Sequence, residues 1–334
     1  MSLEKWTVVA PDGLDVEAID LLKSHDWVKL DQCEGCSSDE KYQRILKADF
    51  LIVRSATKVT QAMLSEASSL KGVIRAGVGV DNIDLKAAES AGVWAWNAPN
   101  GNFQSAAELA IALIFAVARN IGPAYVAGTQ QKWAKKELSS SGRQIFEAKL
   151  GLFGAGNIGK RVAKMASGLG MQVSVCDPFY KPDDLHSYPS ISFEQLLSES
   201  DFISIHSPLL DSTKNVFSKE AFKKMKKDSF LVNAARGGII DEPALLEALE
   251  QGEIAGAALD VFASEPFEGD FYKKLLSSPK LITTPHIGAS TREAQRLVGL
   301  ECVFIIEQVR ASLAENDLRK WPKSLNSPQN PRIS

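Results

Sequence analysis

The stretch LGLFGAGNIGKRVA, residues 150–163, joins a short apolar run to an amphipathic segment through three glycines. Gly154, Gly156 and Gly159 fit the pattern G-x-G-x-x-G. Such a pattern supplies a tight turn, a backbone that can approach a pyrophosphate closely, and a helix N-terminus whose free N–H groups face it. The alternative is a glycine turn that only packs a strand against a helix. The context favours the first interpretation, a βαβ unit that binds a dinucleotide.

An acidic residue supports this interpretation. Asp177 ends the next predicted strand, 18 residues after Gly159. A carboxylate at this place accepts hydrogen bonds from the adenosine ribose and repels a 2′-phosphate, so NAD is favoured over NADP. Residues 154–160 also fit the start of a P-loop. Arg161 follows where a P-loop needs Ser or Thr to hold Mg²⁺, which excludes that motif.

The same alternation of short apolar runs and amphipathic segments extends in both directions from this motif. Alternating strands and helices predict an α/β fold with parallel sheets covered by helices on both faces. The chain therefore contains two Rossmann-like or flavodoxin-like units. The predicted strands are residues 6–10, 50–54, 72–76 and 92–96 in the first unit, and 149–153, 172–176, 202–206, 229–233, 255–260 and 281–284 in the second.

Two longer helical segments divide the chain. An apolar helix is predicted at residues 105–120, and an amphipathic one at 290–312 is long enough to return to the first unit. We therefore expect a discontinuous substrate-binding domain, residues 1–98 plus 289–334, and an NAD-binding domain, residues 99–288. The C-terminal tail, rich in Pro, Ser and Asn, is expected to be disordered at its end.

The composition limits the possible functions. The chain has 334 residues, 45% of them hydrophobic, and a net charge of −3. This balance favours neither nucleic acid nor a membrane as partner. The N-terminus lacks a secretory pattern and no apolar run reaches the roughly 20 residues of a membrane span, so a cytoplasmic protein is expected. Cys33 and Cys36 have no second pair at zinc-binding spacing, so no metal site is predicted.

Four polar residues lie at or just after the carboxyl ends of predicted strands of the second unit: His206, Arg236, Asp260 and His286. The carboxyl ends of parallel strands lie at one edge of a sheet, where ligands bind. We therefore expect these side chains to converge on one crevice. The arginine ends an apolar run and precedes two glycines, which points to an anionic ligand, although a structural ion pair is the alternative.

Several motifs together resemble the D-2-hydroxyacid dehydrogenase family, and within it the phosphoglycerate dehydrogenases. They are VRSATKVT, RAGVGVDNID, NAPNGN, SAAELA, GAGNIG, NAARGGIIDE, AALDVF and TPHIGAST, in an order that covers residues 6 to 310. The resemblance implies NAD-dependent oxidation of a 2-hydroxy acid, most specifically of 3-phospho-D-glycerate to 3-phosphohydroxypyruvate in serine biosynthesis. The chain lacks the length for the C-terminal serine-sensing domain that many of these enzymes carry.

The resemblance implies three catalytic residues. Arg236 would bind the substrate carboxylate, for which a planar guanidinium fork is suited. His286 would exchange the proton of the hydroxyl group, and Glu265 would pair with its ring and orient it. The spacing of 21 residues between Glu265 and His286 is slightly long for the family. We expect a longer surface loop between them.

The resemblance also implies ligand-binding positions. For NAD they are Gly154, Gly156, Asn157, Ile158, Gly159, Asp177, His206, Ser207, Pro208, Ala234, Ala235, Asp260, Gly288, Ala289 and Val78. For the substrate, and its phosphate in particular, they are Arg54, Ser55, Arg75 and Asn102. Structural ion pairs are the alternative for the two arginines.

Other functions remain open at this point. One is a dehydrogenase or reductase for another small acid, such as glyoxylate, hydroxypyruvate or lactate. Another is an NAD-sensing, corepressor-like binding protein, because a fold does not fix a function. In either case we expect a small anionic 2-hydroxy acid or NAD as ligand. The apolar helix 105–120 predicts a homodimer or a dimer of dimers, in which it would pack against its copy.

Overall fold

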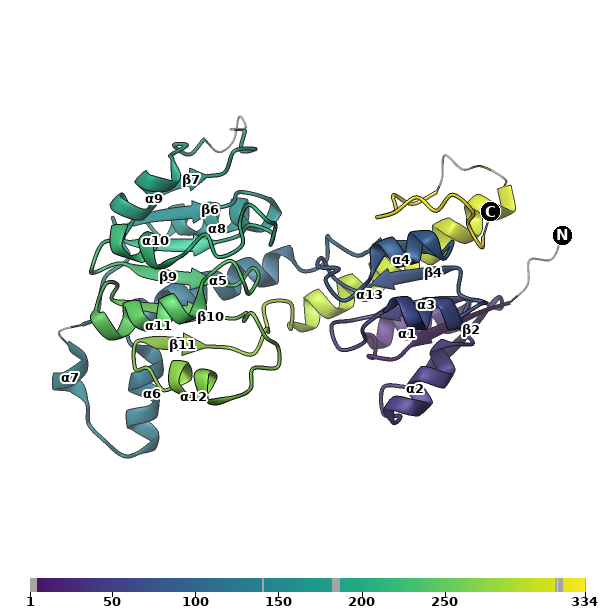
Figure 1. Cartoon of the computed structure of the whole chain (residues 1–334), viewed down its shortest axis with the longest axis horizontal. Helices are drawn as coiled ribbons and strands as arrows, with labels where there is room; N and C mark the ends of the chain where they lie inside the picture. The colour runs from purple at the N-terminus through teal and green to yellow at the C-terminus, as the bar shows by residue number, and fades with distance from the viewer. Residues whose placement is uncertain (1–4, 140, 182–186, 316, 318–320, 334) are drawn as a thin grey trace. The chain divides into compact units, whose positions relative to one another are not determined.

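The computed structural model describes residues 5–139, 141–181, 187–315, 317 and 321–333 (Figure 1). The chain divides into two compact units. We call Met1–Asn102 with Ala289–Ser334 the first unit, and Phe103–Gly288 the second unit. Each has its own parallel sheet and its own cores, and each is described here by itself.

The first unit contains a five-stranded parallel sheet in the order β2-β1-β3-β4-β5. Its strands are β1 Trp6–Ala10, β2 Val28–Gln32, β3 Phe50–Val53, β4 Gly72–Arg75 and β5 Trp94–Asn97. Its helices are α1 Val16–Ser24, α2 Ser38–Ile45, α3 Gln61–Glu66, α4 Leu85–Ser90 and α13 Arg292–Glu315. The order 2-1-3-4-5 is the flavodoxin-like one.

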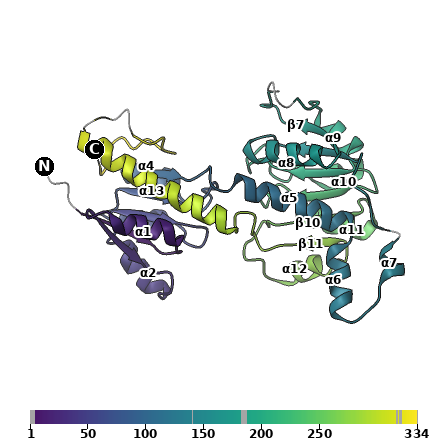
Figure 2. The same ribbon diagram turned by 180° about the vertical axis from the view of Figure 1, so that it is seen from behind.

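Helices cover both faces of this sheet, as parallel strands require. Side chains of α1 and α13 form one core with the sheet, and those of α2, α3 and α4 form a second core on the other face. Figure 2 shows α1 and α13 together over one face. The long α13 therefore brings the chain back to the first unit.

The strand β2 and the helix α2 were not predicted. β2 is an edge strand whose residues are only partly buried, so its apolar signal is weak. α2 begins with a capping box, in which Ser37 and Glu40 each satisfy a backbone N–H of the other. This polar start has no long apolar run after it, and sequence periodicity alone does not identify it.

Residues 321–333 of the C-terminal tail pack on the first unit, where Ile333 is buried, which corrects the expectation of disorder at the end of the tail. It covers the free edge of β5: the Leu325 N–H donates to Ala95, and the buried Asn326 side chain bonds the backbone of Ala95 and Val93. Such cover prevents an edge strand from pairing with another chain. The tail also explains why β5 can carry two large side chains: the rings of Trp94 and Trp96 pack with that of Trp321 in the tail.

The second unit contains a six-stranded parallel sheet in the order β11-β10-β9-β8-β6-β7. Its strands are β6 Lys149–Phe153, β7 Gln172–Cys176, β8 Phe202–Ile205, β9 Phe230–Asn233, β10 Gly256–Leu259 and β11 Leu281–Thr283. A single parallel bridge joins Ser190 to Val175 of β7. If this bridge is counted as a residual strand, the order becomes 3-2-1-4-5-6-7, which extends the dinucleotide-binding order.

Eight helices of the second unit are described. They are α5 Phe103–Ala118, α6 Ile121–Thr129, α7 Lys135–Ser139, α8 Asn157–Gly168, α9 Phe193–Glu199, α10 Lys219–Lys224, α11 Glu242–Gln251 and α12 Asp270–Leu276. One core contains α5 and α8, and the core on the opposite sheet face contains α9, α10, α11 and α12. Figure 2 shows α5 and α8 over the same sheet face.

Most apolar side chains of the helix α5 are buried within the second unit. It packs against α8 and against β9, β10 and β11, and most of its residues are buried. A copy of the chain is therefore not needed to shield it, which removes the reason the sequence offered for a dimer through this helix. A group of exposed apolar side chains lies instead on α6 and beyond it, at Ile121, Tyr125, Val126 and Trp133.

Candidate active site

The glycine motif forms the turn between β6 and α8. Gly154 has a φ of +97°, and a Cβ there would lie 2.8 Å from the backbone of His206. A Cβ on Gly159 would lie 2.4 Å from the carbonyl oxygen of Gly154. At Gly156, by contrast, a Cβ would meet no atom within 4 Å. Two glycines are thus required by the fold, and the third faces open space that a ligand can fill.

The first turn of α8 offers hydrogen-bond donors to that space. The helix begins at Asn157, and its N-cap Gly156 supplies no side-chain hydrogen bond to the N–H groups of the first turn. Helix N-termini with such N–H groups bind phosphate through these donors and the helix dipole. The motif lies beside β8, where the strand order changes direction and where ligands bind in this kind of sheet. The residues therefore fit a dinucleotide.

Asp177 follows β7 and ties the glycine turn to it. Its carboxylate oxygens accept hydrogen bonds from the backbone N–H groups of Ala155, at 2.7 Å, and Phe179, at 2.8 Å. A carboxylate has about four acceptor sites, so two remain for ribose hydroxyls. The Asp177 side chain thus positions the glycine turn and can still accept hydrogen bonds from the adenosine ribose, as the sequence predicted.

His206 follows β8 and faces the same turn. Its Nε2 atom lies 2.8 Å from the hydroxyl oxygen of Ser204, and burial lowers the pKa of His206 to about 4. The ring is therefore neutral at physiological pH and is not suited to hold an anion by charge. Ser207 and Pro208 continue the chain away from this point toward the exposed Leu209 and Leu210.

Arg236 stands in a loop that follows β9. The side chain of Asn233 closes this loop by donating to the Arg236 carbonyl oxygen and accepting from the Ala235 N–H. A Cβ on Gly237 would lie only 1.9 Å from the carbonyl oxygen of Phe262. The glycine after the arginine therefore lets the loop contact the backbone that leads to Glu265.

Glu265 and His286 are in direct contact. The Oε2 atom of Glu265 lies 2.5 Å from Nδ1 of His286, and its Oε1 atom accepts the Phe262 N–H at 2.9 Å. Burial raises the pKa of Glu265, but these two hydrogen bonds and the charge of Arg236 outweigh it, so the pKa lies below its usual value. The three residues therefore interact, and the second ring nitrogen of His286 is left for a reacting group.

Asp260 holds the backbone that carries His286. Its carboxylate accepts hydrogen bonds from the Thr284 hydroxyl and from the N–H groups of Ile287 and Gly288, and its carbonyl oxygen accepts the His286 N–H. These bonds hold His286 in the left-handed region, at a φ of +52°, which is uncommon for residues other than glycine. Asp260 is 1% exposed. In this structure its contacts are structural, and a direct contact with NAD stays a prediction.

The predicted phosphate-binding residues and Val78 lie in the first unit, as does Ala289. Arg54 follows β3, and Arg75 ends the neighbouring strand β4, opposite Val53. Both arginines therefore stand at the carboxyl edge of the first sheet. Ser55 is exposed, whereas Asn102 is 8% exposed.

The loop that begins at Arg54 is fixed by two residues that sequence reasoning missed. The carboxylate of Asp12 accepts the N–H groups of Arg54 and Thr57 and the Thr57 hydroxyl. The Asn82 side chain donates to the carbonyl oxygens of Arg54 and Thr57. Asp12 follows the strand β1, and Asn82 lies within the motif RAGVGVDNID. A polar residue after a strand and a residue within a family motif are both sequence features that could have identified them.

The segment between Glu265 and His286 is not an irregular loop, which corrects the expectation from its length. It contains α12, whose Tyr272 and Leu275 are buried against the core of the second unit. Tyr272 reaches Glu242 at the start of α11, at 2.8 Å. Glu242 is the last residue of the motif NAARGGIIDE, whereas Tyr272 lies in none of the motifs identified in the sequence.

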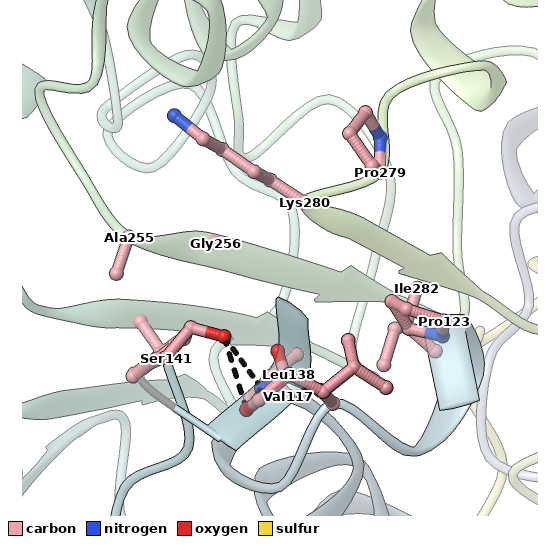
Figure 3. Close-up of a pocket in the computed structure, with 11 residues that line it drawn as sticks. Val117, Pro123, Leu138, Ser141, Ala255, Gly256, Pro279, Lys280 and Ile282 are labelled. Carbon is pink, nitrogen blue, oxygen red and sulfur yellow. Dashed lines mark hydrogen bonds between the residues drawn. The ribbon is translucent and has the colours of Figure 1, made fainter. Parts of the chain in front are cut away.

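A pocket lies at the opposite edge of the second sheet (Figure 3). Its lining includes Phe230 and Gly256, which begin β9 and β10, and Lys280, which precedes β11. These are amino ends of strands, whereas Arg236 and His286 follow carboxyl ends. The pocket is therefore separate from the candidate active site. Two of its polar side chains bond each other, Asn120 and Ser141, and the Lys280 ammonium donates to the Leu249 carbonyl oxygen.

Within the described part of the chain, no group of three His, Cys, Asp or Glu side chains could hold a metal ion. Among the same residues, no single helix is long and apolar enough to cross a membrane; α5 and α6 reach that length only as a pair bent by 69°.

Comparison with known proteins identifies the family. Residues 111–288 match the family described as D-isomer specific 2-hydroxyacid dehydrogenase, NAD binding domain. The chain belongs to this family. The second unit thus contains its NAD-binding domain, and the predictions of an α/β fold, of this family and of NAD as cofactor are confirmed.

Individual relatives of this D-2-hydroxyacid dehydrogenase differ in name. Hydroxypyruvate reductase of Thermotoga maritima is 42% identical over 301 residues, which are 90% of this chain and 97% of that protein. D-3-phosphoglycerate dehydrogenase of Bacillus subtilis is 42% identical over 292 residues, which are 87% of this chain and 54% of that protein. The chain spans about half the length of the phosphoglycerate dehydrogenases that it matches.

Solved structures agree with this assignment. D-lactate dehydrogenase of Aquifex aeolicus, complexed with NAD and lactic acid, is 25% identical and aligns with a TM-score of 0.80. The alignment covers 97% of this chain and 100% of that one. The dehydrogenase described here therefore shares the fold of that enzyme over nearly its whole length.

Proposed function

We propose that this dehydrogenase oxidises 3-phospho-D-glycerate to 3-phosphohydroxypyruvate, and that it does so in the cytoplasm. When bound, NAD⁺ would accept the hydride from C2 of the substrate. His286 takes the proton of the C2 hydroxyl group, and Glu265 orients the ring. The observation that carries this proposal is the contact of 2.5 Å between Glu265 and Nδ1 of His286, which leaves Nε2 for the hydroxyl group.

Arg236 is proposed to bind the substrate carboxylate. Its guanidinium can form two parallel hydrogen bonds with a carboxylate, which fixes the orientation of C2. Support comes from the loop geometry, because Gly237 brings the arginine loop against the chain that carries Glu265. An anion held there also offsets the positive charge that acts on Glu265.

The NAD-binding residues are those of the glycine turn and the strand ends beside it. Their support is the open space at Gly156, the N–H groups of α8 and the placement of Asp177. The proposed set comprises Gly154, Gly156, Asn157, Ile158, Gly159, Asp177, His206, Ser207, Pro208, Ala234, Ala235, Asp260 and Gly288 of the second unit and Val78 and Ala289 of the first.

The phosphate of the substrate is assigned to the first unit. Arg54 and Arg75 stand at one sheet edge, and Ser55 and Asn102 belong to the same unit. A dianionic phosphate needs cationic and polar donors beyond Arg236, because Arg236 is occupied by the carboxylate. The alternative is that both arginines serve only structural contacts. In that case their replacement should affect phosphorylated and unphosphorylated substrates equally.

A second candidate is the reduction of hydroxypyruvate. It is favoured by the relative from Thermotoga maritima, whose name states this activity and which the chain matches over 97% of its length. Hydroxypyruvate is the product proposed above without its phosphate. Both candidates therefore use the same three residues of the second unit and differ only in the need for Arg54 and Arg75.

The deciding experiment compares phosphorylated and unphosphorylated substrates. NADH absorbance is followed with 3-phosphoglycerate and glycerate, and in reverse with 3-phosphohydroxypyruvate and hydroxypyruvate. We expect a higher kcat/KM for the phosphorylated member, and a loss of that preference in Arg75→Ala and Arg54→Ala. If both variants slow hydroxypyruvate as much as its phosphate ester, the phosphate assignment is wrong. Absence of turnover with every acid would instead favour a binding protein.

A further inference from the structure

The loop that carries Glu265 is held by an unusual run of hydrogen bonds. Three successive backbone N–H groups donate to side-chain oxygens: Phe262 to Glu265 at 2.9 Å, Ala263 to Glu242 at 2.7 Å, and Ser264 to Tyr272 at 3.1 Å. We call Phe262–Glu265 the acid loop. Its course is therefore set by three side chains, and not by pairing with a strand or helix.

Two of these side chains form a buried pair. The Tyr272 hydroxyl donates to the second carboxylate oxygen of Glu242 at 2.8 Å, and the two residues are 8% and 5% exposed. Both Glu242 oxygens are therefore used, one by the loop and one by the tyrosine. Burial, together with Glu242, raises the pKa of Tyr272 to about 12, so the hydroxyl keeps its proton.

The pair comes from two helices that bracket the acid loop. Glu242 is the first residue of α11, where the helix dipole stabilises a negative charge. Tyr272 lies in α12, and its ring packs against those of Phe262 and Phe267, with centroids 6.0 Å and 5.9 Å apart. The aromatic contacts fix the ring, so its hydroxyl group is held where Ser264 can reach it.

The acid loop also touches the arginine loop. Its first carbonyl oxygen, on Phe262, occupies the space beside Gly237. A displacement of the loop would therefore change two contacts at once. It would remove the Phe262 N–H from Glu265 and alter the support of the loop that carries Arg236.

We propose that Glu242 and Tyr272 are positioning residues for the proton-transfer pair: they fix the acid loop so that one carboxylate oxygen of Glu265 faces His286. This inference rests on the proposed function of Glu265 and His286. The groups that face Glu265 are His286, Arg236 and the Phe262 N–H, with Tyr272 behind the loop.

A double-mutant cycle tests the proposal on kcat. Tyr272→Phe keeps the ring but removes both hydrogen bonds of its hydroxyl. We expect kcat to fall about ten-fold with little change in the KM for NAD, since small misplacements of reacting groups are costly. In a Glu265→Gln background the same change should lower kcat less than two-fold, because residues that act through one another are not additive. Equal losses in both backgrounds would overturn the proposal.

A matched variant separates positioning from general destabilisation. Phe222→Leu alters a fully buried side chain of the same core that makes no contact with the acid loop's N–H groups. It should lower the thermal midpoint like Tyr272→Phe but leave kcat near its wild-type value. If Tyr272→Phe does not fold, Glu242→Gln replaces it, since its amide keeps the bond to Ala263 but cannot accept the tyrosine hydrogen.

A spectroscopic measurement removes the dependence on activity. With labelled histidine, the ring resonances of His286 should move in Tyr272→Phe toward their positions in Glu265→Gln, while those of His25 stay unchanged. Unmoved His286 resonances would contradict the positioning role. If the wild-type chain turns over no 2-hydroxy acid, the proposed function fails, and this measurement alone decides whether Tyr272 positions Glu265.

Discussion

The carboxylate of Glu265 bonds Nδ1 of His286 at 2.5 Å, although the two residues are separated by a complete helix in the sequence. One residue follows β10 and the other follows β11, and these strands are neighbours in the sheet. Two sets of hydrogen bonds fix the partners of this contact. Asp260 holds the backbone of His286, and the acid loop holds Glu265.

Replacement of either partner should reduce proton transfer. We expect His286→Gln to lower kcat/KM about 1,000-fold and Glu265→Gln about 100-fold, since a positioned acid–base group contributes 10²–10⁴-fold. The pKa of Glu265 lies below 4.5, because hydrogen bonds from His286 and Phe262 outweigh the effect of burial. The carboxylate therefore stays ionised into acid, and its hydrogen bond to His286 should persist there. A Glu265→Gln enzyme with the wild-type pH profile would contradict this assignment.

Gly156→Ala should affect cofactor binding and not folding. A Cβ at this position meets no protein atom within 4 Å, and its φ of −68° is open to alanine. The added methyl group would occupy the space assigned to the pyrophosphate. We expect the Kd for NADH, measured by fluorescence titration, to rise at least about ten-fold by steric exclusion. Gly168→Ala, also without neighbours within 4 Å, is the matched control. Unchanged NADH binding in Gly156→Ala would place the pyrophosphate elsewhere.

Gly237→Ala should disturb the arginine loop. The new Cβ would lie 1.9 Å from the backbone of Phe262, so one of the two loops must move. We expect a fall in kcat/KM of at least about 100-fold, with the larger part in the KM for the acid, because Arg236 is displaced from the carboxylate. Gly35→Ala, which meets nothing within 4 Å, should leave both values unchanged. A Gly237→Ala enzyme with the wild-type KM would show that Arg236 does not bind the acid.

An ion cluster around the buried Asp201 of the second unit should make stability depend on pH. Asp201 has a side chain only 9% exposed. Burial raises its pKa, but Lys226, the Lys149 N–H and Arg143 outweigh burial and lower it. A pKa below the unfolded value means that this stabilisation is present above about pH 4 and is lost as the pH falls toward the folded pKa.

Chemical denaturation of Asp201→Asn tests this linkage. We expect the free energy of unfolding to drop by about 2 kcal/mol at pH 7, as for hydrogen bonds to charged groups. The difference from wild type should shrink below pH 4, where the wild-type carboxylate also becomes protonated. Asp270→Asn changes an exposed ion pair and should have no measurable effect. A loss in Asp201→Asn that is constant down to pH 2 would exclude the electrostatic explanation.

Self-association remains a prediction, now with a different surface. Tyr125 and Val126 on α6 are 72% and 51% exposed, and Trp133 is 88% exposed. Grouped apolar exposure of this kind is typical of an interface. We expect a homodimer by light scattering, and a shift to monomer in Tyr125→Asp with Val126→Asp. Phe304→Asp, on the exposed side of α13, should not change the molar mass. A monomeric wild-type chain would refute the prediction.

The sequence was sufficient to predict the fold class, and it supplied the candidate site residues that remain predictions. Apolar runs of four to six residues predicted ten of the strands, because both faces of a parallel sheet are buried. The edge strand β2 was not predicted, because its residues are only partly buried and its apolar pattern is weak. The C-terminal tail was misjudged for a related reason: Asn326 and Trp321 are stabilised by partners on β5, which lie more than 200 residues away.

By itself, the sequence determined the local chemistry of this protein. The glycine spacing, the aspartate after the next strand and the residues that follow strand ends are properties of short segments, so they are legible without coordinates. Only the tertiary structure decided which side chains share a contact. Glu265 meets His286, and Glu242 meets Tyr272, because neighbouring strands and helices bring distant segments together, and no local pattern of residues encodes those distances.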